Sequence, residues 1–195
     1  MALPDLFILR HGETAWNREG RMQGGLDSPL TDLGRQQAVG MGDVLRSLEV
    51  TADSHRVISS PQGRAMHTAE LLGLAAPEPV DDLREIHMGD WIGLSRAEID
   101  SRWPSADPEE DFVDFYARVP NGESFPALWD RVGQVLAMLD RPTVIVTHGF
   151  TSRFLRTRAL GLPMYAVREV PGGQGVVFRI KDGEHLVFGS EIFGV

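Results

Sequence analysis

The sequence predicts an α/β protein, a three-layer α/β/α sandwich in which helices cover both faces of a mostly parallel central sheet. Three short segments rich in apolar residues, 6–9, 56–59 and 144–146, have the length and composition of strands buried on both faces. Segments with the apolar spacing of amphipathic helices separate them along the chain. Strands that alternate with helices are typical of a parallel sheet, because each crossover between parallel strands needs a long connection.

The first half of the chain supplies two strands and two helices. Residues 6–9 form the first predicted strand. Thr31 is the predicted N-cap of a helix whose apolar positions within 33–48 fall on one face. The second strand, 56–59, runs into a Ser-Ser-Pro sequence that ends it, and a helix is predicted over 62–72.

The middle of the chain is its least regular part. A stretch rich in proline and aspartate, 77–83, leaves room for one short strand around Val80. The segment 85–122 follows, and we expect it to be an insertion that faces the substrate. Within it, Asp107-Pro108-Glu109-Glu110 has the pattern of a capping box with proline at the first helical position. A helix is therefore predicted to begin there and to continue with the apolar residues of 112–119.

The last third of the chain returns to a regular pattern. Residues 125–139 give the clearest amphipathic helix in the sequence, and 144–146 form the third buried strand. A further helix is predicted over 151–160. Residues 175–180 and 185–188 flank a four-residue polar turn and predict a β-hairpin.

Composition limits the classes of function that the chain can have. Its 195 residues predict one domain, 1–195, with a net charge of −9 and no cysteine. The acidic balance argues against binding to nucleic acid or to an anionic membrane, and the lack of cysteine excludes disulfides and thiolate nucleophiles. The N-terminus lacks the positive region of a signal peptide, and no apolar stretch approaches the roughly 20 residues that span a bilayer. We therefore expect a cytoplasmic protein.

Histidine and arginine gather at the predicted strand ends. His11 and His148 each follow a strand and precede a glycine, Arg10 adjoins His11, and Arg64 lies in the first turn of the helix after the second strand. Because ligands of open α/β sheets bind at the carboxyl ends of the strands, we expect these side chains to converge. A neutral imidazole is a competent nucleophile, and arginine matches phosphate oxygens with a fork of donors. The sequence thus predicts a cationic pocket for a phosphate group.

Longer motifs extend this pattern over nearly the whole chain, and with them the chain resembles the histidine phosphatase superfamily, whose fold is that of the cofactor-dependent phosphoglycerate mutases. The resemblance rests on the order and spacing of Arg10-His11-Gly12-Glu13-Thr14, Trp16-Asn17, Gly20-Arg21-Met22-Gln23-Gly24, residues 27–34 and 59–69, Leu83-Arg84-Glu85-Ile86, Gly89-Asp90-Trp91, Asn121-Gly122-Glu123-Ser124 and Thr147-His148-Gly149.

The resemblance implies a role for each matching residue. His11 would be phosphorylated, and Glu85 would act as the general acid. The remaining site residues would surround the phosphoryl group. Arg10, Arg64 and His148 would hold its oxygens, and Asn17, Gln23 and Gly24 would line the site.

Three positions depart from the pattern of the superfamily. Ile92 stands where glutamate is frequent, Phe150 where a second glycine is common, and His87 where many members carry aspartate. None of them removes a catalytic group, so the departures bear on the substrate. His87 either lines the mouth of the pocket or caps a loop.

The predicted activity is that of a phosphomonoesterase that passes through a phosphohistidine on His11, without a cofactor and without a metal site. Its substrate would be a small phosphorylated metabolite, with specificity set by 85–122 and by Arg18 and Arg21 near the mouth. Arg96 and Arg102 are solvated or receive a second anionic group. A cofactor-dependent phosphoglycerate mutase and a non-catalytic interaction protein are the alternatives. The substrate and the oligomeric state are not predicted.

Overall fold

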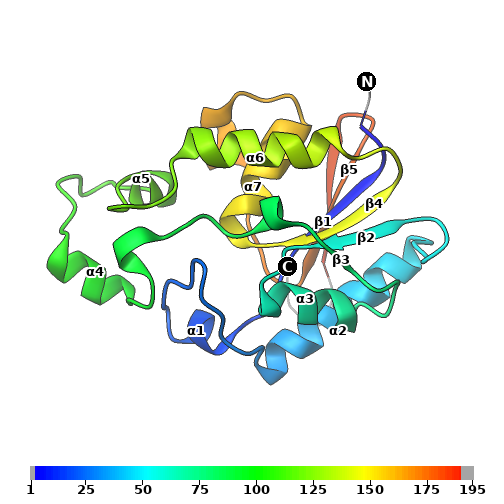
Figure 1. The fold of residues 1–195 in the computed structure, drawn as a ribbon, viewed down its shortest axis with the longest axis horizontal. Helices are drawn as coiled ribbons and strands as arrows, with labels where there is room; N and C mark the ends of the chain where they lie inside the picture. The colour runs from blue at the N-terminus through cyan, green and yellow to red at the C-terminus, as the bar shows by residue number, and fades with distance from the viewer. Residues whose placement is uncertain (1–2, 190–195) are drawn as a thin grey trace.

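A computed structural model describes residues 3–189 and shows a six-stranded sheet with helices on both faces (Figure 1). The order across the sheet is β3-β2-β4-β1-β5-β6. The strands are β1 (Leu6–Arg10), β2 (Arg56–Ser59), β3 (Glu78–Pro79), β4 (Thr143–Thr147), β5 (Val176–Lys181) and β6 (Glu184–Gly189). The first four in that order run parallel, and the β5–β6 hairpin adds two antiparallel strands at one edge. The predicted α/β/α sandwich with a mostly parallel sheet is confirmed.

Residues 3–189 contain both α-helices and short 3-10 helices. The α-helices are α1 (Ala15–Arg18), α2 (Asp32–Ser47), α3 (Gly63–Leu71), α4 (Arg96–Arg102), α5 (Phe112–Ala117), α6 (Phe125–Ala137) and α7 (Gly149–Ala159). The 3-10 helices are η1 (Asp81–Leu83), η2 (Gly89–Trp91) and η3 (Met164–Glu169). Within residues 3–189, no helix is long and apolar enough to cross a membrane.

Two apolar cores lie on the two faces of the sheet because side chains alternate along each strand. Phe7 and Leu9 of β1 face a core that contains Met41 of α2 and Ala65 of α3. Leu6 and Ile8 of the same strand face a larger core that includes α6 and α7. Burial on both faces explains why the strands read as short apolar runs in the sequence.

Most predicted elements are found within one or two residues of their predicted bounds. The side-chain oxygen of Thr31 accepts a hydrogen bond from the backbone N–H of Gly34 at 3.0 Å, so the predicted cap of α2 is confirmed. The short strand expected around Val80 is β3, directly before it. The helix expected from residue 151 begins earlier, because His148 is the N-cap of α7.

The helix start predicted at Asp107 is wrong. Residues 108–109 form a turn, and α5 begins only at Phe112, where the carboxylate of Asp111 accepts the N–H groups of Val113 and Asp114 at 2.8 and 2.9 Å. The capping box fails because the carboxylate of Glu110, which would have to reach back to residue 107, is bound by Arg118 instead. Ion pairs of Glu110 with Arg118 and Arg96 thus replace the contact that the local motif requires.

The segment 85–122 contributes α4 and α5, which lie with α1 on the left of Figure 1, beyond the sheet. Its core is aromatic: Trp91 is fully buried and lies 4.7 Å, between ring centroids, from Phe115 of α5. Arg118 lies over the Trp91 ring at 4.8 Å. These contacts attach the segment to the larger core next to the strand ends.

Candidate active site

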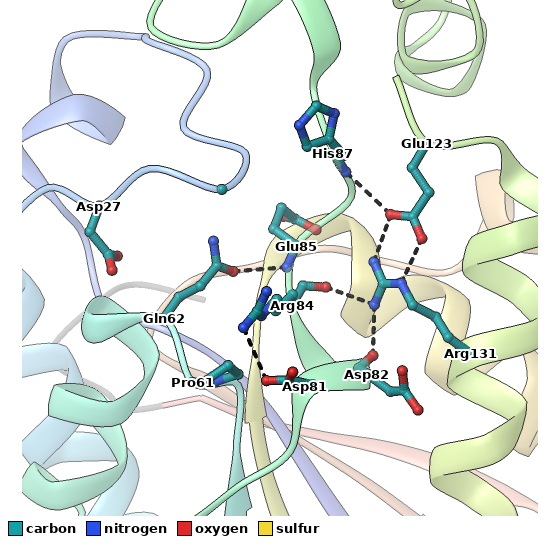
Figure 2. A pocket seen from close by; sticks show the side chains of 11 residues that line it. Asp27, Pro61, Gln62, Asp81, Asp82, Arg84, Glu85, His87, Glu123 and Arg131 are labelled. Carbon is teal, nitrogen blue, oxygen red and sulfur yellow. Dashed lines mark hydrogen bonds and ion pairs between the residues drawn. The ribbon is translucent and has the colours of Figure 1, made fainter. Parts of the chain in front are cut away.

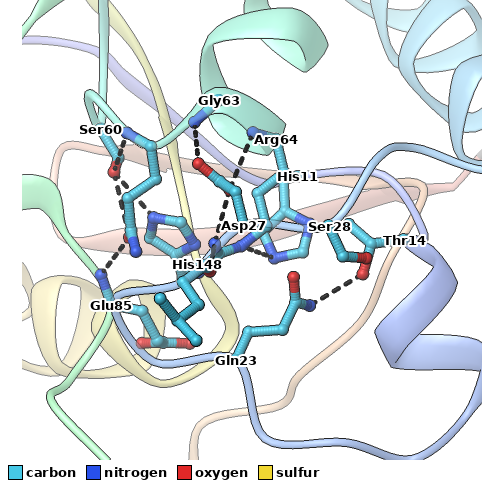
Figure 3. A network of polar contacts seen from close by, with 12 residues as sticks. His11, Thr14, Gln23, Asp27, Ser28, Ser60, Gly63, Arg64, Glu85 and His148 are labelled. Carbon is cyan, nitrogen blue, oxygen red and sulfur yellow. Dashed lines mark hydrogen bonds and ion pairs between the residues drawn. The ribbon is translucent and has the colours of Figure 1, made fainter. Parts of the chain in front are cut away.

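The parallel pairing of β1 and β4 brings the two predicted site histidines together. Arg10, the last residue of β1, pairs with Thr147, the last of β4, and His11 donates its backbone N–H to the carbonyl of Thr147 at 2.9 Å. His11 and His148 therefore leave adjacent strands side by side. Their ring centroids are 5.2 Å apart with an interplanar angle of 61° (Figure 3).

The tautomer of His11 follows from its hydrogen bonds. The ring nitrogen Nδ1 lies 2.7 Å from the carbonyl oxygen of Gly12, so Nδ1 carries the proton and donates it. This leaves the lone pair on Nε2, which accepts the Nε–H of Arg64 at 3.3 Å. The turn needs glycine at position 12, because a Cβ atom there would overlap the carbonyl oxygen of Gly34. His11 is thus presented with Nε2 as its nucleophilic atom.

Both histidines are buried and neutral. Burial lowers the pKa of His11 well below its ordinary value, and the charges of Arg10 and Arg64 lower it further. Burial also lowers the pKa of His148 well below the ordinary value, with Arg64 as the next largest cause. For His11 the two arginines act in the same direction as burial, and the loss of hydration is the larger cause.

Arg64 is fixed by several acceptors at once. Its terminal nitrogens donate to the carbonyls of Leu26 and Gly24 at 2.7 and 3.0 Å and to the carboxylate of Asp27 at 2.8 Å. Asp27 also accepts the N–H of Gly63 at 2.6 Å, at the start of α3. The residue is 3% exposed, so the fork is held in one orientation. Nothing in the local sequence pattern points to this role of Asp27.

Two buried nitrogen atoms next to the histidines lack partners within residues 3–189. They are Nε of Arg10 and Nδ1 of His148. His148 meets the hydroxyl of Ser60 at 2.8 Å through its other nitrogen, and when Ser60 donates that bond, Nδ1 carries a proton. Buried donors without an acceptor are costly, so their presence here fits a site built for an anion.

The carboxylate of Glu85 lies at the N-terminus of α7. Its Oε1 accepts three hydrogen bonds at 3.0 Å, from the N–H of Ile86, the N–H of Thr151 and the hydroxyl of Thr151. Its Oε2 accepts one, from the N–H of Phe150 at 3.2 Å. Oε2 is therefore the oxygen with capacity left to carry a proton.

Gln62 ties Glu85 to the phosphate-binding side of the site. Its side-chain carbonyl accepts the backbone N–H of Glu85 at 2.9 Å (Figure 2). Its amide donates to the carbonyl of Gly24 at 2.7 Å. The same carbonyl of Gly24 accepts from Arg64. Gln62 is 7% exposed, and its part in the site is not visible in the sequence pattern.

The remaining predicted residues line the same space. Gln23 donates to the hydroxyl of Thr14 at 2.8 Å. Asn17 is held by Gln174, whose amide also donates to the backbone carbonyl of His11 at 3.2 Å. Gln174 comes from the loop before β5 and was missed, because no local motif marks a contact with residues so distant in sequence.

Two cavities meet at Glu85. The inner one, of about 180 Å³, is lined by all the predicted site residues except His148, which is buried behind His11, and also by Arg21, Met88 and Tyr116. The outer one, of about 590 Å³, lies beyond Gln62 and is lined by His87, Arg84 and Arg131 together with several carboxylates (Figure 2). His87 thus lies at the mouth, where its Nδ1 accepts the N–H of Gly89.

The arginines expected near the mouth are engaged elsewhere or stay outside. Arg21 lines the inner cavity but pairs with Glu19 and Glu98, both at 3.2 Å. Arg96 pairs with Asp100 and Glu110, as expected of a solvated side chain. Arg18 and Arg102 line neither cavity. Within residues 3–189, no group of three or more acidic or histidine side chains has the arrangement of a metal site.

Comparison with known proteins decides the family. A family model described as the histidine phosphatase superfamily, branch 1, matches residues 6–185. The chain belongs to this superfamily. Residues from several of the motifs that carry the resemblance line the inner cavity.

The relatives of this histidine phosphatase superfamily member carry two kinds of name. A protein named glucosyl-3-phosphoglycerate phosphatase from Mycolicibacterium vanbaalenii is 37% identical over 180 residues, 84% of this chain and 77% of the relative. A protein from Salmonella choleraesuis, named "Probable phosphoglycerate mutase GpmB", is 38% identical over 181 residues, 85% and 79% of the two chains.

Solved structures show the same fold. The open reading frame Rv3214 from Mycobacterium tuberculosis superposes with a TM-score of 0.77 at 31% identity and covers 95% of each chain. A mycobacterial glucosyl-3-phosphoglycerate phosphatase, solved in complex with VO3, gives a TM-score of 0.75 at 32% identity over 95% and 96% of the chains.

Proposed function

We propose that this protein is a phosphomonoesterase that hydrolyses small phosphorylated metabolites through a phosphohistidine on His11. The observation that carries the proposal is the orientation of His11: Nδ1 is fixed by Gly12, and Nε2 faces the cavity beside Arg64. The net charge of −9 favours a cytoplasmic metabolite over nucleic acid as substrate.

In the first step, Nε2 of His11 attacks phosphorus and the bond from phosphorus to the ester oxygen breaks. A proton on Oε2 of Glu85 moves to the departing oxygen, so that the alcohol leaves neutral. Because the ring enters the reaction neutral and with its other nitrogen fixed, no proton has to leave His11 before attack.

In the second step, water attacks the phosphohistidine. Glu85, now a carboxylate, accepts a proton from the water, and the bond from phosphorus to Nε2 breaks as inorganic phosphate forms. His11 returns to its neutral form and Glu85 to its protonated form. The two steps together consume one ester and one water and release one alcohol and one phosphate.

Three further groups stabilise the phosphoryl oxygens, which is the dominant need in phosphoryl transfer. Arg10 offers its unpaired Nε–H, and Arg64 offers the Nε–H that contacts His11. His148 offers Nδ1–H in the tautomer in which Ser60 donates to its Nε2. Asn17, Gln23 and Gly24 complete the lining in this proposal.

Hydrolysis is favoured over mutase activity by the charges around the cavity. A phosphoglycerate mutase must also bind the carboxylate of its substrate, which calls for an arginine or lysine free of other partners. Arg21, the further arginine in the lining of the inner cavity, is already paired with two carboxylates. The outer cavity has more carboxylates than arginines.

A substrate panel tests the proposal. Phosphate release would be measured with alkyl monophosphates, 3-phosphoglycerate and glucosyl-3-phosphoglycerate, the compound in the name of the Mycolicibacterium relative. Interconversion of 2- and 3-phosphoglycerate with added bisphosphoglycerate would be measured in parallel. The proposal predicts phosphate release from several esters. It also predicts that mutase turnover is no faster than phosphate release. Mutase turnover without phosphate release would contradict it.

A further inference from the structure

Tyr116 brings a phenol hydroxyl into the catalytic cavity. It lines the inner cavity together with Arg10 and Glu85, and it comes from α5, within the segment 85–122. Within residues 3–189 the hydroxyl takes part in no hydrogen bond, and the charges of Glu85 and Arg10 lie close enough to shift its pKa. A polar group that opens into a reaction cavity without a protein partner is available to a substrate.

Two sets of contacts fix the position of Tyr116, one made by its ring and one by the helix α5. The ring stacks on Phe150, the residue whose N–H binds Glu85, with ring centroids 4.2 Å apart and an interplanar angle of 6°. The helix itself is tied to η3, because Arg168 pairs with Asp111 and Asp114. The hydroxyl therefore has a fixed position, and replacing tyrosine with phenylalanine would remove it without removing the stack.

The Tyr116 ring is on the Glu85 side of the site, because Phe150, on which it stacks, also donates its N–H to Oε2 of Glu85. Donors for the phosphoryl oxygens come from the strand ends and from α3, whereas Glu85 must lie next to the departing oxygen. Burial raises the pKa of Tyr116 to about 12, and among charged groups the Glu85 carboxylate has the largest effect. The phenol thus stays protonated and is a hydrogen-bond donor next to the general acid.

We propose that the Tyr116 hydroxyl binds a hydroxyl group on the carbon next to the esterified carbon, so that the preferred substrates are monophosphates of vicinal diols and polyols. The inference rests on the proposed function, since it takes Glu85 as the acid at the departing oxygen. A neutral hydroxyl suits this position, because its oxygen can accept a hydrogen bond from the phenol while its own proton stays in place.

The test compares two esters of the same length, 2-hydroxyethyl phosphate and n-propyl phosphate, in which a hydroxyl replaces a methyl group. In Tyr116→Phe we expect kcat/KM for the hydroxyethyl ester to fall about five- to tenfold, the effect of one lost hydrogen bond. The value for the propyl ester should fall by less than about twofold, since it has no group for Tyr116 to bind. Tyr165→Phe is the matched control, because Tyr165 is 74% exposed and lies outside both cavities.

Equal losses on both esters would overturn the inference, because Tyr116 would then act on the phosphoryl group or on the fold. No loss on either ester would overturn it as well. The proposed function is judged separately, by whether the wild-type protein hydrolyses both esters. If the wild type hydrolyses both esters and Tyr116→Phe shows no difference between them, the proposed function is supported and only the inference about Tyr116 is wrong.

Discussion

The guanidinium of Arg64 donates its Nε–H to Nε2 of His11 across 3.3 Å, and its other nitrogens are held by Asp27 and two backbone carbonyls. The same group that would bind a phosphoryl oxygen thus rests against the nucleophilic atom. On substrate binding the Nε–H exchanges one acceptor for another, and the fork itself does not have to move. Arg64 is in this sense preorganised for the anion.

Replacing Arg64 with lysine should lower kcat/KM by about tenfold or more, equivalent to about 1.4 kcal/mol. Lysine keeps the charge but cannot contact His11, Asp27 and the carbonyl of Gly24 together. Steady-state kinetics with an alkyl phosphate measure the effect. Arg35→Lys serves as the control, because Arg35 is exposed and its ion pair with Asp32 is long, at 4.0 Å. Wild-type kinetics in Arg64→Lys would place this residue outside the site.

The role of Glu85 predicts a dependence on the leaving group. Glu85→Gln should slow single-turnover phosphorylation by alkyl phosphates by roughly 10²–10⁴-fold, and by p-nitrophenyl phosphate much less. An alkoxide departs badly without a proton, whereas nitrophenolate departs well without help. Both esters slowing by the same factor would mean that Glu85 is an orienting residue and that another group supplies the proton.

Gln62 should act through Glu85. Gln62→Met removes the acceptor for the Glu85 N–H while keeping the volume, so it should slow alkyl phosphates about tenfold and p-nitrophenyl phosphate less. Gln37→Met is a matched control: Gln37 is also 7% exposed and also accepts a backbone N–H, that of Glu13. A selective effect in the Gln37 variant, or none in the Gln62 variant, would refute this assignment.

The lowered pKa values of His11 and His148 predict that neither ring titrates near 6.5 in the free protein. Nuclear magnetic resonance of the imidazole C–H groups between pH 7.5 and 5.5 measures this, with assignments from the His11→Asn and His148→Gln variants. The two assigned signals should stay in place, while a free imidazole standard in the same samples shifts. Movement of either signal with a midpoint near pH 6.5 would show that the ring is hydrated.

The same pKa values set the sign of a stability change. The unfolded state takes up protons on both histidines below their ordinary pKa of 6.5, and the folded state does not, so the free energy of unfolding falls as pH falls through that value. At one pH unit below 6.5, a histidine that stays neutral in the folded state contributes a loss of about 1.4 kcal/mol. Urea unfolding at pH 7.5 and 5.5 should therefore show a smaller loss in His148→Gln than in the wild type. An equal loss would contradict the assignment.

Sequence patterns identified the parts of the site that stand at strand ends. Arg10, His11 and His148 were predictable because a buried apolar strand and the residue after it are adjacent in sequence, and parallel strands end at one edge. Glu85 was assigned by resemblance alone. In the structure its carboxylate lies on the N-terminus of α7, some 65 residues further along the chain.

What the sequence did not predict depends on contacts between distant segments. Asp27, Gln62 and Gln174 each hold a site residue through one or two hydrogen bonds, and no periodicity marks such a partner. The helix start predicted at Asp107 fails because of another side-chain contact, since the carboxylate of Glu110 pairs with Arg118 instead of capping a helix at residue 107. Local patterns therefore located the candidate site residues at the strand ends but not the residues that hold them.

The central claim is that His11 carries the phosphoryl group, and rapid-quench labelling tests it most directly. Protein mixed with a radiolabelled phosphomonoester for milliseconds and quenched in base should carry a label that survives base and is lost in acid, as a phosphoramidate requires. Mass spectrometry should place the phosphate on His11, and His11→Ala, compared with His67→Ala as a control outside the inner cavity, should carry none. Label that persists in His11→Ala, or that is stable to acid, would contradict the account.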